Sequence, residues 1–207
     1  MKILFTLIAF FILTACISSL GIQEINGNDL HYQALITQSQ NNPTITTVME
    51  LREIYPQTGQ YRQSLIVEKQ LHQPILNTIT DNAWQDCITY SQQLLAVNYT
   101  SLSGHYGAMV CQLELGQKQH SLHHQNMLNM LLEAIWAGAN GESIESAFVA
   151  ISEQEISQFI EFHALDIIKQ HTIVIEEKTY KQVSLHDLRN EDLFDWYFDI
   201  TAFAEMN

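Results

Sequence analysis

Apolar residues in the middle of the chain recur at the spacing of an α-helix. Leu102, Tyr106, Met109 and Leu113 follow one another at intervals of four, three and four residues, which places them on one helix face. The same period predicts antiparallel helices over 84–97, 102–115 and 119–137. These helix–turn–helix units resemble tetratricopeptide-type hairpins, but no second copy with that signature follows. An ordinary helical bundle therefore remains the alternative.

Shorter helical segments precede this region. Asn28 resembles an N-cap, and Pro43 and Pro74 are expected to end helices because proline disfavours a helical conformation at the residue before it. The helices predicted here cover 29–38, 46 or 47 to 55, 61–73 and 75–82. We therefore expect one helical region over 28–138.

The pattern changes after the small-residue loop 137–141. Trp196, Phe198 and Ile200 alternate with polar positions, a period of two that is typical of a half-buried strand. Ser152 and Glu155 form a capping box, which begins one amphipathic helix. Other short apolar runs predict strands over 147–151, 172–175 and 179–185. The expected fold is thus α+β: N-terminal helical hairpins followed by a small, mostly antiparallel sheet with one helix in 139–207, packed with the helical region as one unit.

The N-terminal sixteen residues have the order of an export signal rather than of a structural helix. Lys2 precedes an apolar run from 3 to 13, which is shorter than the roughly 20 residues that span a bilayer. Residues 13–16 read Leu-Thr-Ala-Cys and resemble the lipobox of bacterial lipoproteins. That resemblance implies a signal peptide over 1–15, acylation of Cys16 with palmitate-type chains, and a tether over 16–27. Because Ile17 stands where Asp favours inner-membrane retention, we expect an outer-membrane lipoprotein with its body in the periplasm.

Charge narrows the range of partners. The chain has 9 basic and 23 acidic residues, a net charge of −14, and removal of Lys2 with the signal peptide would make it −15. Such acidity argues against nucleic acid and against anionic lipid headgroups as partners. We therefore expect membrane attachment through the N-terminal lipid alone, a cell-envelope protein as partner, and no cofactor.

Cys87 and Cys111 are the cysteines that follow Cys16. They lie 12 residues on either side of position 99, so a hairpin of 84–97 with 102–115 places them at the same height. An exported protein keeps disulfides, but buried free thiols are also common in protein cores. Both states remain open from the sequence.

Histidines supply the sharpest candidate for metal chemistry. His120 and His124 share a helix face at a spacing that two metal-binding imidazoles can use, and Glu114 is the expected third ligand. His105 is expected to lie about 12 Å away along the helix axis and so to take no part. The alternative is an exposed first helical turn that is merely rich in His and Gln.

Four glutamates gather around the loop-to-strand junction: Glu142, Glu145, Glu153 and Glu155. Two carboxylates held close together can act as acid and base, whereas 142 and 145 could instead fill the first turn of a short helix. Arg52, near Tyr55 and Tyr61, could bind an anion or tie its helix to a neighbouring loop. The sequence has no nucleophile elbow or Ser-x-x-Lys motif.

These patterns together resemble a family of bacterial envelope proteins, domain of unknown function 4919. The similar positions span most of the mature chain: Leu51-Arg52, Tyr55, Thr58, Tyr61, His105-Tyr106, Leu115-Gly116, Gly141, Ser143, Glu145, Ala147, 148–152, Glu153, Glu155 and 197–200. The family favours Gly-Asp-Gly at 139–141, where this chain has Ala-Asn-Gly, and Thr at position 146. The resemblance implies an α+β envelope protein and brings no activity. It also singles out Gly141, Ser143 and Glu145 as a candidate functional loop.

Three functions follow as hypotheses. The first is a lipid-anchored scaffold that works without catalysis and offers its helical half to another protein. The second is a hydrolase at the lipid or cell-wall surface, using the glutamates of 142–155 or the histidines of 120–124. The third is a small-ligand binder with its site near the 138–155 loop, between the helical half and the sheet.

Overall fold

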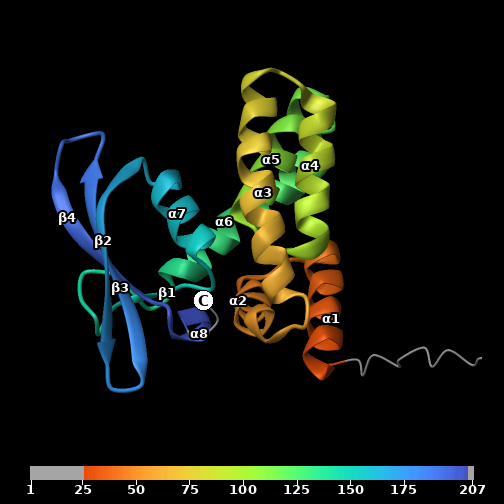
Figure 1. The fold of residues 1–207 in the computed structure, drawn as a ribbon. Helices are drawn as coiled ribbons and strands as arrows, with labels where there is room; N and C mark the ends of the chain where they lie inside the picture. Colours follow the sequence, from red (N-terminus) through yellow and green to blue (C-terminus); the bar gives the residue numbers. More distant parts are fainter. Residues whose placement is uncertain (1–25, 205–207) are drawn as a thin grey trace, which may run out of the picture.

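The computed structural model describes residues 26–204, in which helices precede a small sheet (Figure 1). The expected signal peptide, Cys16 and the tether up to residue 25 lie outside this range. The elements are α1 (Gly27–Asn41), α2 (Ile45–Ile54), the 3-10 turn η1 (Tyr55–Gln57), α3 (Tyr61–Thr80), α4 (Trp84–Val97), α5 (Leu102–Glu114), α6 (Lys118–Trp136), β1 (Phe148–Val149), α7 (Glu153–Phe162), β2 (Leu165–Ile175), β3 (Lys178–Asp187), β4 (Leu193–Asp199) and α8 (Thr201–Ala204). Within the described range, no helix is both long and apolar enough to cross a membrane.

Polar side chains fix where the helices begin. The Ser152 side chain accepts a hydrogen bond from the Glu155 amide at the start of α7, which confirms Ser152 as the predicted cap. The reciprocal bond of a capping box is not formed, because the Glu155 carboxylate accepts from the Ile151 amide and from Arg52 instead. Thr44 and Ser101 cap α2 and α5 in the same way. Helix α1 begins at Gly27, two residues before the predicted start, because Asn26 rather than Asn28 supplies its cap.

The prediction that a helix ends at Pro74 is wrong. Helix α3 runs through Pro74 to Thr80. The proline removes one backbone hydrogen bond from the helix, and packing of the later turns against the core offsets that loss. The carbonyl left without its helical donor belongs to Gln70, which is exposed to solvent. Beyond the proline, Ile75 is fully buried and anchors the last turns.

Successive helices of the middle region pack side by side as up-and-down neighbours (Figure 1). Cys87 on α4 and Cys111 on α5 form a disulfide, with 6.2 Å between their Cα atoms. Gly107 lets α5 approach closely, because a Cβ there would lie 2.3 Å from Ser91 Oγ and 2.5 Å from Ile75 Cγ2. Of the two cysteine states left open by the sequence, the structure contains the bonded one.

The sheet has the strand order β1-β4-β3-β2. Strand β1 runs parallel to β4, and the other neighbours are antiparallel. Residues Val183 and Trp196 pair across β3 and β4, and the centre of the Trp196 ring lies 5.6 Å from that of the Phe159 ring of α7. Helix α7 lies between the sheet and the helices (Figure 1). The α+β prediction is therefore confirmed, although β2 is longer than expected and carries a bulge between Ile167 and Lys169.

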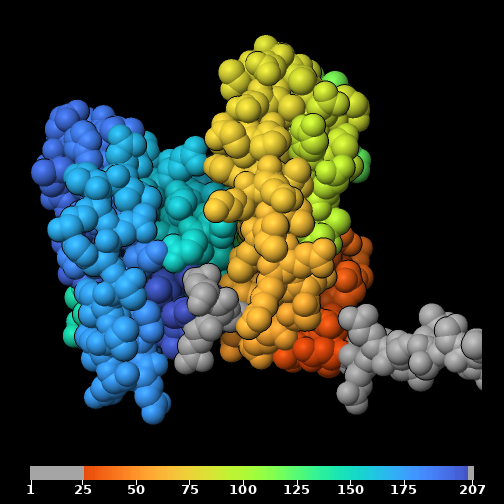
Figure 2. All heavy atoms as spheres, viewed as in Figure 1, coloured from red at the N-terminus to blue at the C-terminus, as the bar shows by residue number. Residues whose placement is uncertain are grey.

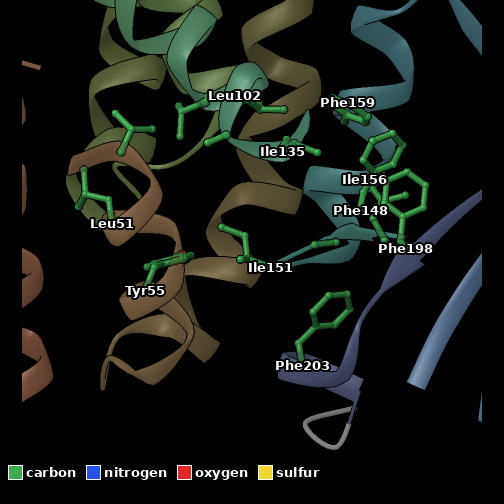
Figure 3. Close-up of a cluster of buried hydrophobic side chains, with 14 of the residues drawn as sticks. Leu51, Tyr55, Leu102, Ile135, Phe148, Ile151, Ile156, Phe159, Phe198 and Phe203 are labelled. Carbon is green, nitrogen blue, oxygen red and sulfur yellow. The ribbon is translucent and has the colours of Figure 1, made fainter. Parts of the chain in front are cut away.

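One hydrophobic core runs through both halves (Figure 3). Leu51 and Leu102 contribute from the helices, whereas Phe148, Phe159 and Phe198 contribute from the sheet region. A smaller cluster surrounds the disulfide and includes Ile75, Ile88 and Leu94. Because the larger core crosses the boundary near residue 138, the two halves depend on each other for burial of their apolar faces.

Candidate functional site

Arg52 connects the two halves of the molecule through a buried ion pair. Its Nε and Nη2 donate to the two carboxylate oxygens of Glu155, both at 2.9 Å, and the two side chains are only 7 % and 6 % exposed. The remaining donors reach the carbonyls of Ala134 at 3.2 Å and Val149 at 2.8 Å. Four donor bonds of the guanidinium are therefore made within the protein, and Arg52 connects α2 to the 149–155 segment. Little donor capacity is left for binding an anion.

The tyrosines near Arg52 complete the same junction. The Tyr61 hydroxyl donates to the carbonyl of Ile151, and the Tyr55 hydroxyl bonds to Ser64 Oγ. Burial raises the pKa of both phenols, so they remain protonated donors. The residues that carried the family resemblance, from 51–61 and from 148–155, therefore meet one another across the two halves of the fold.

The loop after α6 is a structural support for Phe148. Gly141 has a φ of +71°, and a Cβ there would lie 2.2 Å from Cε2 of the Phe148 ring. The Gly141 carbonyl also accepts a hydrogen bond from the Tyr197 amide at 2.8 Å. Ser143 bonds to Ser146 within the loop, their Oγ atoms 3.2 Å apart. Gly141 and Ser143 of the candidate functional loop thus shape the backbone.

The glutamates of the loop-to-strand junction do not converge. Glu155 is paired with Arg52, Glu153 with Lys181 of β3, and Glu142 bonds to Asn140 on the exposed loop. Glu145 is exposed, and its bond to Ser143 lowers the pKa of its carboxyl. The alternative, that 142 and 145 fill the first turn of a short helix, is also wrong, because turns and bends occupy 141–146. The acid–base pair expected from these residues is therefore not assembled.

The histidines are arranged differently from the expected metal site. The Nδ1 atoms of His105 and His124 lie 2.9 Å apart, so the expected separation of His105 from His124 was wrong. The turn between α5 and α6 comes earlier in the chain than expected, because Ser121 Oγ donates to the Met109 carbonyl and so lies level with it. Glu114 therefore lies closer to the turn than His124 does, and not beside it. In residues 26–204, no three His, Cys, Asp or Glu side chains are grouped so as to hold a metal. The set of Glu114, His120 and His124 is not brought together.

His120, His123 and His124 instead border a surface hollow of about 530 Å³ between α4 and α6, with the end of α1 at its rim. We call it the histidine hollow. In its wall, the Tyr99 hydroxyl is 3.0 Å from His123 Nε2. Behind the wall, His105 Nε2 is 2.9 Å from the Tyr99 carbonyl. The lining residues are Gln40, Gln92, Leu95, Ala96, Tyr99, Gln119, His120, His123 and His124.

Burial favours the neutral form of His105, His123 and His124. It lowers the pKa of His105 to about 3 and that of His124 to about 4, with the neighbouring histidine charges adding to the effect. Burial also lowers the pKa of His123 and raises that of the Tyr99 phenol to about 12. At neutral pH His123, His124 and Tyr99 therefore present uncharged donors and acceptors to the hollow.

Two further hollows bear on the functional hypotheses. A groove of about 400 Å³ between α5 and α6 adjoins the histidine hollow at Gln119. It is lined by four apolar side chains (Met109, Val110, Leu113 and Leu122) and four polar ones (Lys118, Gln119, Ser121 and Gln125). A cleft of about 210 Å³ separates α3 from α7 and is bordered by Lys69, His72 and Glu153; Figure 2 shows the surface hollowed between these two helices. This cleft lies where the small-ligand hypothesis expects a site, between the helical half and the sheet.

Glu68 is a buried acid that the sequence analysis did not identify. It is 2 % exposed and accepts hydrogen bonds from Asn98 and Ser101, both at 2.8 Å, and from Gln158 at 3.2 Å. Burial raises the pKa of its carboxyl. No basic residue among the described ones pairs with it, so it serves as an acceptor that joins α3, the α4–α5 turn and α7.

The family assignment follows from comparison with known proteins. A family model described as "Domain of unknown function (DUF4919)" matches residues 20–207, and the chain belongs to this family. No curated protein and no solved structure matches it significantly.

Proposed function

We propose that this member of the DUF4919 family is a lipid-anchored protein of the bacterial cell envelope that acts by binding another protein, without catalysis. Three observations support the proposal. The N-terminal residues 13–16 resemble a lipobox, the chain contains an intramolecular disulfide of the kind that exported proteins retain, and the helical half has an exposed apolar groove. The acyl group at Cys16 would place the acidic body next to an outer membrane.

The groove between α5 and α6 is the observation that carries the interaction role. Leu113 and Leu122 line it with 51 % and 48 % of their surfaces exposed, and Lys118 is the single charged side chain in its lining. Neighbouring exposed apolar side chains around a groove mark interaction sites. Such a groove fits one apolar face of an amphipathic helix.

The charge of the chain indicates which helices would be favoured. With a net charge of −14, the protein attracts basic partners over long range and repels acidic ones. We therefore assign the groove to an amphipathic helix of an envelope protein with a net positive charge.

Site-specific photocrosslinking in intact cells tests this assignment. A photoreactive amino acid at position 113 or 122 of the full chain should capture the same basic protein, because both positions border the groove. The matched control carries the same group at Ile66, which is 60 % exposed on α3. The captured protein, once purified, should bind the wild-type chain and lose binding to Leu122→Glu. Equal capture at position 66, or an acidic partner without an amphipathic helix, would contradict the assignment.

The hydrolase hypothesis finds no support in the geometry. The histidines of 120–124 lie in the first two turns of α6, whereas the glutamate loop follows its other end, about 24 Å away along the axis. Glu153 and Glu155 are also engaged by Lys181 and Arg52. The groups that such chemistry needs are therefore spread over separate faces.

A further inference from the structure

The histidine hollow is lined without a single Asp, Glu, Lys or Arg side chain, although 32 of the 207 residues of the chain are of these types. Its polar groups are three carboxamides, three imidazoles and one phenol, and Leu95 and Ala96 supply an apolar patch. Such a wall offers neither a counter-charge for an ion nor a purely apolar surface for a lipid. Its chemistry fits an uncharged ligand that forms many hydrogen bonds.

A fixed chain of hydrogen bonds orients one of these groups. The Tyr99 carbonyl can only accept, so His105 Nε2, at 2.9 Å, carries the hydrogen. Because His105 is neutral, its Nδ1 has a lone pair and accepts from His124 Nδ1, at 2.9 Å. His124 is neutral as well, and its Nε2 is therefore left as a bare acceptor. The backbone of the α4–α5 turn thus determines the tautomer of a histidine that lines the hollow.

We propose that the histidine hollow binds an uncharged saccharide. A hydroxyl group both donates and accepts, and the carboxamides of Gln40, Gln92 and Gln119 offer both functions side by side. The lone pair of His124 Nε2 would accept from a sugar hydroxyl, and Leu95 and Ala96 would contact the C–H face of the ring. A volume of about 530 Å³ is within the range of small-molecule sites. The site adjoins the groove assigned above to a protein partner, and the two share Gln119 in their linings.

Histidine-selective nitrogen NMR on the full chain in detergent micelles tests the first step. At neutral pH, His124 should show a protonated Nδ1 and an unprotonated Nε2, and His105 the opposite tautomer. Titration with neutral glucose, galactose, mannose and N-acetylglucosamine oligomers should then shift the His124 Nε2 resonance for at least one series. A protonated Nε2 on His124, or no shift with any of these sugars, would overturn the proposal.

A charge placed in the hollow provides the matched comparison. Gln92 lines the hollow, whereas Gln93 is an exposed neighbour on the same helix that does not. Gln92→Glu should weaken sugar binding about tenfold or more, because a bound hydroxyl loses its donor, and Gln93→Glu should leave the affinity unchanged. Equal loss in both variants would contradict a site at this position.

An uncharged peptide distinguishes the other ligand that shares this chemistry. An acetylated and amidated Ser-Gly-Ser-Gly peptide offers neutral amide groups but no sugar ring. The proposal expects no shift of His124 with this peptide at concentrations where the sugar saturates. A peptide that shifts His124 while every sugar fails would assign the hollow to polypeptide and refute the saccharide.

Discussion

At the scale of single residues, Arg52 is the side chain on which most of the junction depends. It reaches Glu155, Ala134 and Val149 at once while almost fully buried. A buried ion pair of this kind adds little when compared with apolar residues, but the loss of one partner leaves an uncompensated charge. Replacing Arg52 alone should therefore destabilise the fold more than replacing Arg52 and Glu155 together.

Arg52→Met should lower the free energy of unfolding by about 3–5 kcal/mol, because the Glu155 carboxylate would stay buried without its partner. Adding Glu155→Leu to that variant should restore most of the loss. Urea unfolding followed by circular dichroism measures both changes. Arg62→Met, at an exposed position of α3, is the control and should change stability by less than about 0.5 kcal/mol. A double variant as unstable as Arg52→Met would contradict the ion-pair explanation.

Gly141 illustrates a second residue-scale effect. Gly141→Ala should cost about 3 kcal/mol, since it combines a left-handed backbone with a collision against the Phe148 ring. Gly138→Ala has a similar φ of +77° but nothing within 4 Å of its Cβ, so it should cost only about 1 kcal/mol. Thermal unfolding of the two variants compares them directly. Equal losses would show that the ring contact contributes nothing.

At the scale of elements, the sequence predicted what depends on neighbours in the chain. Helices α4, α5 and α6 and the Ser152 cap follow from local period and capping residues, and each was placed within a residue or two. The errors came from tertiary contacts. Helix α3 passes Pro74 because the buried Ile75 holds its later turns, and the early turn between α5 and α6 brings His105 to His124.

The candidate site was the harder part to predict for the same reason. Arg52 and Glu155 are 103 residues apart, and no local pattern signals that they pair. Glu68 lies in a helix as one polar residue among several, and only the fold reveals its burial. The position of Gln40 at the rim of the histidine hollow also depends on how α1 packs against later helices. Local patterns thus located the histidines but not the surface they form.

The disulfide between α4 and α5 gives the element-scale prediction. It closes a segment with a sequence separation of 24, and its loss should destabilise the fold by about 3 kcal/mol through the greater freedom of the unfolded chain. Urea unfolding of Cys87→Ala/Cys111→Ala against wild type measures this. Alkylation of the denatured, unreduced protein should leave both cysteines unlabelled. Two labelled residues would contradict the bond.

At the scale of the whole molecule, Glu68 couples the packing of the two halves to pH. Its carboxyl has a raised pKa in the folded state, so the folded protein binds its proton more tightly than the unfolded chain does. The contribution of Glu68 to stability is therefore fully present below its unfolded pKa of 4.5 and is lost as the pH rises through the folded value.

The difference in unfolding free energy between wild type and Glu68→Gln should accordingly fall as the pH rises from about 4 to about 8. Taking this difference cancels the titration of groups that the substitution does not affect. Urea unfolding across that range provides the values. A difference that is constant or that grows with pH would contradict the raised pKa.

We propose that one acylated thiol, at Cys16, attaches an acidic body whose two halves share one core to a membrane. Mass spectrometry of the protein extracted intact from its native membrane tests this attachment most directly. We predict that the mature protein begins at Cys16 and carries three acyl chains there. The Cys16→Ser variant should no longer be found in the membrane fraction. An unmodified N-terminus at any other residue would contradict the lipid anchor and the envelope location proposed with it.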